Sequence, residues 1–248
     1  MEKLEADIVI VGTGASGLFA ALHVPNDKKV LMLTKSDAEN SDSFLAQGGI
    51  CVLRDKNDFD SFMEDTMKAG HYENRKESVE IMINSSRDII NELIGYGVNF
   101  ATKDGELDYT REGAHSKPRI LFHEDITGKE ITSTLLDAVR KLENVTIMEY
   151  VTMTDIIEKD NVCYGVLAKD ANNNEMSIEA GYTIFACGGI GGLYNHSTNY
   201  PHLTGDAIAI AIQHGIKLEN VDYVQIHPTT LYTKKKGRAF LISESVRG

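Results

Sequence analysis

The chain opens with a run of apolar residues that passes directly into a glycine-rich turn. Residues 6–17 read Ala-Asp-Ile-Val-Ile-Val-Gly-Thr-Gly-Ala-Ser-Gly. The continuous apolar segment 8–11 is typical of a buried strand, and residues 18–22 favour a helix. Residues 28–34 then predict a second strand. The beginning of the chain therefore indicates a strand-helix-strand unit of an α/β fold.

Each glycine of this turn has its own physical purpose. Gly12 permits the sharp turn out of the strand, Gly14 leaves room for backbone to approach phosphate oxygens, and Gly17 lets the helix pack closely. A helix that begins near residues 15–16 directs its free N–H groups and positive dipole end at an anion. The turn therefore favours a bound dinucleotide pyrophosphate. A tight turn without a ligand is the alternative, because such turns also occur for purely structural reasons.

Helical and strand periods alternate along the rest of the chain. Helices are predicted at residues 60–69, 77–94, 128–142 and 204–214. Strands are predicted at residues 145–149, 155–159, 162–169, 175–179 and 182–186, of which 155–179 form a meander. Residues 40–50 show neither period and predict a loop. A second glycine cluster, 187–192, follows the last strand, at the sheet edge where open α/β sheets bind ligands.

Composition narrows the function classes. The chain has 248 residues with 25 Lys and Arg against 37 Asp and Glu, which gives a formal net charge of -12. This charge disfavours nucleic acid and anionic membrane as partners. No apolar stretch approaches the roughly 20 residues of a membrane helix, and the acidic amino terminus leaves no room for a signal peptide. We expect a cytoplasmic protein.

The three cysteines, Cys51, Cys163 and Cys187, are far apart in sequence and odd in number. They predict free thiols in a reducing compartment, with no disulfide framework and no zinc or other metal site. Cys187 lies next to Gly188, so contact with a ligand is an alternative there. A small packing residue is the favoured interpretation.

The end of the second predicted strand lacks an expected carboxylate. Strand-helix-strand units that bind NAD carry an acidic residue there to hold a ribose hydroxyl, whereas this chain has Thr34 and Lys35. The departure weakens an NAD interpretation. It leaves two alternatives: a phosphorylated ribose on Lys35, or a flavin that is held in another way.

Two further segments could carry chemistry. Residues 110–119 combine a glutamate, a histidine and two arginines, which is the composition of a site that orients a charged small molecule. A solvated polar loop explains that segment equally well. His227 precedes Pro228, which favours extended backbone from which the ring could reach a carboxylate, although a structural role is the more common one. Glu244 and Arg247 are spaced as a helical ion pair, either in a proton relay or on the surface.

Several motifs follow one another in a specific order. They are Gly-Thr-Gly-Ala-Ser-Gly at 12–17, Ser-Phe-Leu-Ala-Gln-Gly-Gly-Ile at 43–50, Glu-Asp-Thr at 64–66 with Ala-Gly at 69–70, Thr-Arg-Glu-Gly and His-Ser within 110–116, Thr-Gly-Asp at 204–206, His-Pro-Thr at 227–229, and Ser-Glu with Arg-Gly within 243–248. This order resembles the flavoprotein family of fumarate reductase, succinate dehydrogenase and L-aspartate oxidase. The resemblance implies a Rossmann-like FAD-binding domain with a β-meander at 1–222, and the start of an inserted α+β capping domain at 223–248.

Two details resemble the aspartate oxidase branch of that family. Asp42 stands where members with iron-sulfur partners tether FAD through a histidine, so the resemblance implies noncovalent FAD. The segment with Glu112 is similar to the one whose glutamate faces the amino group of aspartate, and a carboxylate there discriminates aspartate from succinate by charge. The Thr34 and Lys35 pair is also common in that branch.

The resemblance also implies roles for individual residues. The FAD contacts are Gly12, Thr13, Gly14, Ala15, Ser16, Gly17, Lys35, Asp42, Ser43, Phe44, Leu45, Ala46, Gln47, Gly48, Gly49, Val151 and Asp206. The substrate contacts are Glu112, His227 and Ser243, and the proton-transfer residues are Glu244 and Arg247. The implied activity is oxidation of L-aspartate to iminoaspartate, with O2 or fumarate as the acceptor, as the first step of NAD biosynthesis. The implied downstream partner is quinolinate synthase.

The resemblance also implies a longer protein. The arginine that the family uses as a proton donor lies in a segment expected beyond Gly248. We therefore expect an amino-terminal part that is inactive alone. The alternatives are a soluble relative of fumarate reductase or succinate dehydrogenase, and a non-catalytic FAD-binding module.

Overall fold

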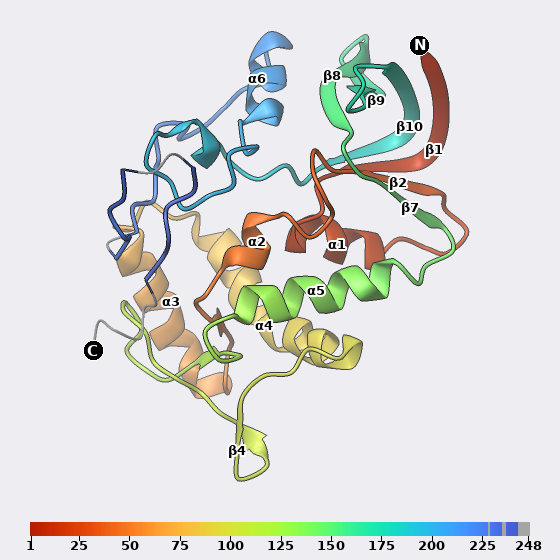
Figure 1. Cartoon of the computed structure of the whole chain (residues 1–248). Coiled ribbons are helices and arrows are strands. Elements are labelled where there is room, and N and C mark those ends of the chain that lie inside the picture. Colours follow the sequence, from red (N-terminus) through yellow and green to blue (C-terminus); the bar gives the residue numbers. More distant parts are fainter. Residues whose placement is uncertain (228, 235–236, 243–248) are drawn as a thin grey trace. The chain divides into compact units, whose positions relative to one another are not determined.

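A six-stranded sheet organises the larger part of the computed structural model, which describes residues 1–227, 229–234 and 237–242. The strand order is β7-β2-β1-β10-β9-β8 (Figure 1). The bounds are β1 Glu2–Val11, β2 Val30–Leu33, β7 Val145–Met148, β8 Thr152–Lys159, β9 Val162–Lys169 and β10 Glu175–Phe185. Strands β7, β2, β1 and β10 are parallel, whereas β9 and β8 continue the sheet antiparallel. The predicted α/β sheet with a β-meander is confirmed.

The predicted strand-helix-strand unit is present as β1, α1 (Ala15–Leu22) and β2. Val9, Ile10 and all of β2 are buried, as the continuous apolar runs indicate. β1 pairs in parallel with β2 on one side and with β10 on the other. The strands that follow β1 along the chain are therefore added first on one side of it and later on the other, which makes β1 part of a topological switch point. Ligands of doubly wound sheets bind at the carboxyl edge of such a point.

The two longest strands, β1 and β10, differ most from their predictions, and for one reason. β1 begins at Glu2 rather than at residue 8, and β10 is continuous where two strands, 175–179 and 182–186, were predicted. The first half of β1 alternates exposed and half-buried residues, and it pairs in register with the first half of β10. In the sequence, the charged residues on the exposed face resemble those of a tail or a turn. In the structure, strand pairing satisfies the backbone hydrogen bonds of both segments.

The helices follow the predicted order with shifted ends. They are α2 Asp42–Leu45, α3 Phe59–Ala69, α4 Lys76–Tyr96, α5 Thr127–Val139 and α6 Asp206–Gln213. The short helix α2 lies inside residues 40–50, so the prediction of a loop throughout that segment was wrong. α6 starts two residues later than predicted because Gly205, at φ 72°, is left-handed and outside the helix. The shorter elements are β3 Ile50–Cys51, β4 Thr102–Lys103, β5 Glu106–Leu107 and β6 Ile120–Leu121, with 3-10 turns η1 Lys56–Asp58 and η2 Gly191–Leu193.

The chain divides into two compact units. The first unit comprises residues 1–45 and 135–248, and the second comprises 46–134. The first is built on the six-stranded sheet, with a core that includes Val9, Val166 and Ile178. The second has its own core between α3 and α4, centred on Phe62 and Ile83. The predicted division at residue 222 stays a prediction.

None of the helices in the described ranges is long and apolar enough to span a membrane. The three cysteines are free, as predicted.

Candidate functional site

A cavity of about 430 Å³ lies within the first unit at the carboxyl ends of β1, β2 and β10. This volume is in the range of small-molecule and cofactor pockets. The glycine-rich turn, the end of β2, residues 40–43 and residues 202–207 supply most of the lining. The cavity therefore occupies the place that the sheet topology predicts for a ligand.

The turn at the end of β1 is possible only with glycine at two positions. Gly12 has φ 118°, and a Cβ there would lie 2.2 Å from the carbonyl oxygen of Ala186. A Cβ at Gly17 would lie 2.1 Å from the carbonyl oxygen of Gly12. Both separations are far below van der Waals contact, so any side chain there would push the turn away from β10 or from α1. The backbone of the turn thus packs directly against the backbone at the end of β10 and the start of α1 against the turn, with no room for side chains.

Thr13 provides a direct indication of a polar ligand. The residue is 2% exposed and lines the cavity, and its hydroxyl oxygen has no hydrogen-bond partner in the structure. Leaving a buried hydroxyl unpaired costs about 1–3 kcal/mol. The N-terminus of α1 begins beside it, and the Ala15 N–H donates to the Ser43 hydroxyl at 3.1 Å. A ligand with phosphate oxygens would complete this arrangement.

Lys35 is held by partners across the cavity. Its ammonium group donates to the Thr204 hydroxyl at 2.7 Å and to the Asp206 carboxylate at 2.8 Å. Asp206 is the first residue of α6, where its charge is favourable near the helix N-terminus. Because the Lys35 charge is already paired, the arrangement weakens the alternative of a phosphorylated ribose and favours a flavin.

The cavity brings together about half of the predicted cofactor contacts. Those that line it are Gly12, Thr13, Gly14, Ser16, Lys35, Asp42, Ser43, Val151 and Asp206. Ala15, Gly17, Phe44 and Leu45 belong to the same unit but do not line it. Ala46, Gln47, Gly48 and Gly49 belong to the second unit.

Several lining residues were not predicted as cofactor contacts. They are chiefly Cys187, Gly188, His202, Leu203 and Thr204. The glycine cluster after β10 signals the first two, whereas nothing in the local pattern marks His202. Burial, with the nearby Asp206 charge, raises the pKa of the Cys187 thiol to about 11. Cys187 is therefore a protonated wall residue rather than a nucleophile.

Glu112 lies on a loop of the second unit that is closed by strand pairing. Thr110 and Ile120 form an antiparallel bridge, and β6 then pairs with β3. This pairing brings the Gly49 N–H to 3.4 Å from the Glu112 carboxylate. Two segments that the sequence marked separately, 43–50 and 110–116, thus meet at this contact.

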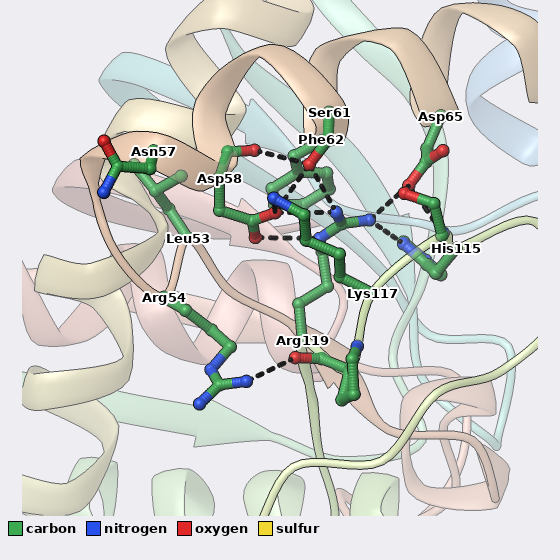
Figure 2. Close-up of polar contacts among 12 residues, drawn as sticks. Leu53, Arg54, Asn57, Asp58, Ser61, Phe62, Asp65, His115, Lys117 and Arg119 are labelled. Carbon is green, nitrogen blue, oxygen red and sulfur yellow. Dashed lines mark hydrogen bonds and ion pairs between the residues drawn. The ribbon is translucent and has the colours of Figure 1, made fainter.

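Arg119 organises the base of the same loop (Figure 2). Its guanidinium is fully buried and donates two hydrogen bonds to Asp58, at 2.8 and 3.0 Å, and one to Asp65 at 2.5 Å. It also donates to the Ser61 hydroxyl and lies 4.9 Å from the centre of the Phe62 ring. The segment is therefore not simply a solvated polar loop, and this arginine is fully engaged by the protein instead of a small molecule.

The charges in this cluster shift the pKa of its members. Burial opposes ionisation of Asp58, but hydrogen bonds from Arg119 and Ser61 lower its pKa to about 2. Burial, together with the Arg119 charge, lowers the pKa of His115. The His115 Nδ1 lies 3.1 Å from an Arg119 nitrogen, so it accepts this hydrogen bond and the ring is neutral with its proton on Nε2.

The remaining predicted site residues are less fully described. His227 is half-buried in the first unit, and its Nδ1 accepts a hydrogen bond from the Thr229 N–H at 3.3 Å. Ser243, Glu244 and Arg247 lie outside the described residues.

Comparison with known proteins assigns the chain to a family. Residues 7–248 match the family described as FAD binding domain. The chain belongs to this family. It is 45% identical over 247 residues to an L-aspartate oxidase of Clostridium perfringens and 46% identical over 248 residues to one of Clostridium acetobutylicum. Each match covers 99% of this chain but only 56% and 57% of the respective relatives. The chain therefore spans little more than half the length of these relatives.

A solved structure supports the same fold. The FrdA chain of Escherichia coli quinol fumarate reductase is 26% identical, with a TM-score of 0.92, and the match covers 100% of this chain and 43% of that one. FAD is the cofactor of this domain, and the Rossmann-like FAD-binding fold that the resemblance implied is confirmed. The unpaired Thr13 hydroxyl and the close approach of backbone at Gly12 fit a dinucleotide at this cavity.

Proposed function

We propose that the whole protein is an FAD-dependent L-aspartate oxidase, which converts L-aspartate to iminoaspartate as the first step of NAD biosynthesis. The observation that carries the proposal is the identity of 45–46% along the whole chain to two L-aspartate oxidases. Bound FAD supplies a hydride acceptor, and O2 or fumarate then takes the electrons. A quinolinate synthase would use the product.

Glu112 is proposed to orient the substrate. A carboxylate attracts the ammonium group of aspartate. Succinate has no amine, so it lacks this attraction. The Gly49 N–H contact and the Arg119 cluster fix the loop that carries Glu112. His227 and Ser243 are proposed as substrate contacts, and Glu244 and Arg247 as the proton-transfer pair.

We also propose that FAD is bound without a covalent link. Asp42 stands at the position of the histidine tether, and a carboxylate does not form that histidyl bond. The remaining proposed FAD contacts are those of the glycine turn, the 42–49 segment, Lys35, Val151 and Asp206.

The test is substrate oxidation by the full-length protein that contains this chain. We expect peroxide from L-aspartate in air, and succinate from fumarate when L-aspartate is the electron donor. Glu112→Gln should reduce kcat/KM for aspartate more than that for fumarate, because only aspartate carries the ammonium group. Glu106→Gln, an exposed carboxylate on β5, is the matched control and should change neither. Equal losses for both substrates in Glu112→Gln would remove the proposed role.

A second candidate is a fumarate reductase or succinate-oxidising flavoprotein, favoured by the TM-score of 0.92 to the FrdA chain. Oxidation of succinate without oxidation of aspartate would support it. A third, a non-catalytic FAD-binding module, is motivated by the partial coverage of the relatives. FAD binding by the full-length protein without turnover of either substrate would support this third candidate.

A further inference from the structure

One wall of the FAD cavity is an irregular segment that ends at Asp206, the first residue of α6, and is held at both ends by residues from the beginning of the chain. This segment, residues 199–206, is called the 199–206 wall below, and its residues 202–206 line the cavity. Lys35 holds the end near α6 through Thr204 and Asp206. Asp42 holds the other end, and both anchors lie within the first unit.

The Asp42 carboxylate makes two contacts with the wall. One oxygen accepts a hydrogen bond from the Tyr200 N–H at 3.0 Å, and the other accepts from the Asn199 side-chain amide. The orientation of that amide is fixed, because its oxygen accepts a hydrogen bond from the Ser197 hydroxyl at 3.1 Å. A neutral side chain without two acceptor oxygens could not satisfy both donors in the same way.

The contact reaches the cavity through stacked rings. Tyr200 and His202 stack with centroids 5.2 Å apart and an angle of 21° between the ring planes. His202 lines the cavity, as does Asp42 itself. Fixing the Tyr200 backbone therefore helps to fix the ring of His202, a residue that lines the cavity.

The other side of Asp42 is connected to the phosphate end of the cavity. Its neighbour Ser43 accepts a hydrogen bond from the Ala15 N–H at the start of α1. Residues 42 and 43 thus join the glycine turn, by one contact, to the 199–206 wall, by two. Hydrogen bonds to a charged acceptor are stronger than those between neutral groups. The two contacts that the Asp42 carboxylate accepts from the wall are therefore the stronger part of this connection.

We propose that Asp42 is a positioning residue for FAD: its carboxylate clasps the 199–206 wall against the glycine turn and so shapes the cavity to which the cofactor binds. The proposal rests on the assignment of FAD to this cavity, not on the aspartate oxidase activity. It differs from the proposal that Asp42 merely fails to tether FAD, because it gives the carboxylate a task of its own.

The test compares FAD binding by the wild-type chain, Asp42→Ala and Asp42→Asn, with Asp37→Ala as the matched control. Asp37 is an exposed carboxylate of the same connection that accepts from Tyr150 and Asn40 but does not line the cavity. Loss of the charged hydrogen bonds in Asp42→Ala should weaken FAD binding about tenfold. Asp42→Asn retains an acceptor for the Tyr200 N–H and should rescue part of the loss, whereas Asp37→Ala should bind as wild type does.

Amide hydrogen exchange of Tyr200 in the FAD-free chain provides a second, independent measurement. Its N–H should be protected in the wild-type chain and in Asp42→Asn, and should exchange faster in Asp42→Ala. Equal FAD affinities for the wild type and Asp42→Ala, or equal losses in Asp42→Ala and Asp37→Ala, would overturn the proposal. If the wild-type chain binds no FAD, the cofactor assignment to this chain fails, and unchanged Tyr200 exchange in Asp42→Ala would then separately overturn the clasp.

Discussion

At the scale of single residues, the sequence indicates chemistry best where backbone geometry permits only one residue type. Gly12 and Gly17 were predictable, because a strand that turns into a helix at a ligand leaves no room for a side chain, and the structure confirms the crowding there. Arg119 was not, because its partners Asp58 and Asp65 precede it by 61 and 54 residues. Pairing between such distant residues depends on tertiary structure rather than on any local period.

The buried position of Arg119 predicts a large loss of stability on its removal. Arg119→Met keeps most of the side-chain volume but leaves the carboxylate of Asp58, which is 3% exposed, without its main partner. Breaking a buried ion pair in this way costs about 3–5 kcal/mol. Arg54→Met is the control: that guanidinium is exposed over the Tyr109 ring and should cost less than about 1 kcal/mol. Urea unfolding of both variants checks the difference, and similar losses would contradict the account.

The same cluster predicts a dependence of stability on acid. The pKa of Asp58 is about 2 in the folded chain, against 3.8 for an ordinary aspartate side chain, so its folded-state pKa is depressed. A carboxyl whose pKa is depressed in the folded state stabilises the protein above its unfolded pKa. This stabilisation is lost as the pH falls through the folded pKa. About 2 kcal/mol should therefore disappear between pH 3.8 and about 2. Unfolding free energies of wild type and Asp58→Asn over this range check it, and identical slopes would refute it.

At the scale of elements, the longer helices could be predicted because their apolar residues recur with a helical period, and the inner strands because they are continuous apolar runs. The outer half of β1 could not, since Glu2, Lys3 and Glu5 look like a charged amino-terminal tail. Their strand structure comes from pairing with β10, which is more than 170 residues away in sequence. Similarly, the whole of β10 emerged only because its two halves have neighbours on the sheet.

The alternation of half-buried and exposed residues along the outer half of β1 predicts unequal effects on stability for substitutions at adjacent positions. Leu4 packs against the core of the first unit, whereas Lys3 is exposed on the other face. Leu4→Asp buries part of a charge and should lower the free energy of unfolding by about 2 kcal/mol. Lys3→Asp should change it by no more than about 0.5 kcal/mol. Thermal or urea unfolding distinguishes them, and equal effects would mean that this segment does not form the strand.

At the scale of the whole molecule, the chain contains the glycine turn and the 199–206 wall of the same cavity within one compact unit. The motif order predicted the family, because several motifs in one order are far more specific than a single glycine turn, and the match over residues 7–248 confirms it. Glu112 and His227, which the motif order joins in one predicted site, belong to different units. The chain spans little more than half the length of the relatives, and the oxidase activity is what we propose for the full-length protein.

The central claim is that this chain binds FAD in the cavity of its first unit and without a covalent bond. The most direct measurement saturates the purified 248-residue chain with FAD, removes the excess, denatures the protein and filters it. We expect equimolar FAD in the filtrate, and none from a folded Gly12→Ala chain, whose new Cβ would meet the Ala186 carbonyl at 2.2 Å. A wild-type chain that retains no flavin, or flavin that stays with the denatured chain, would contradict the account.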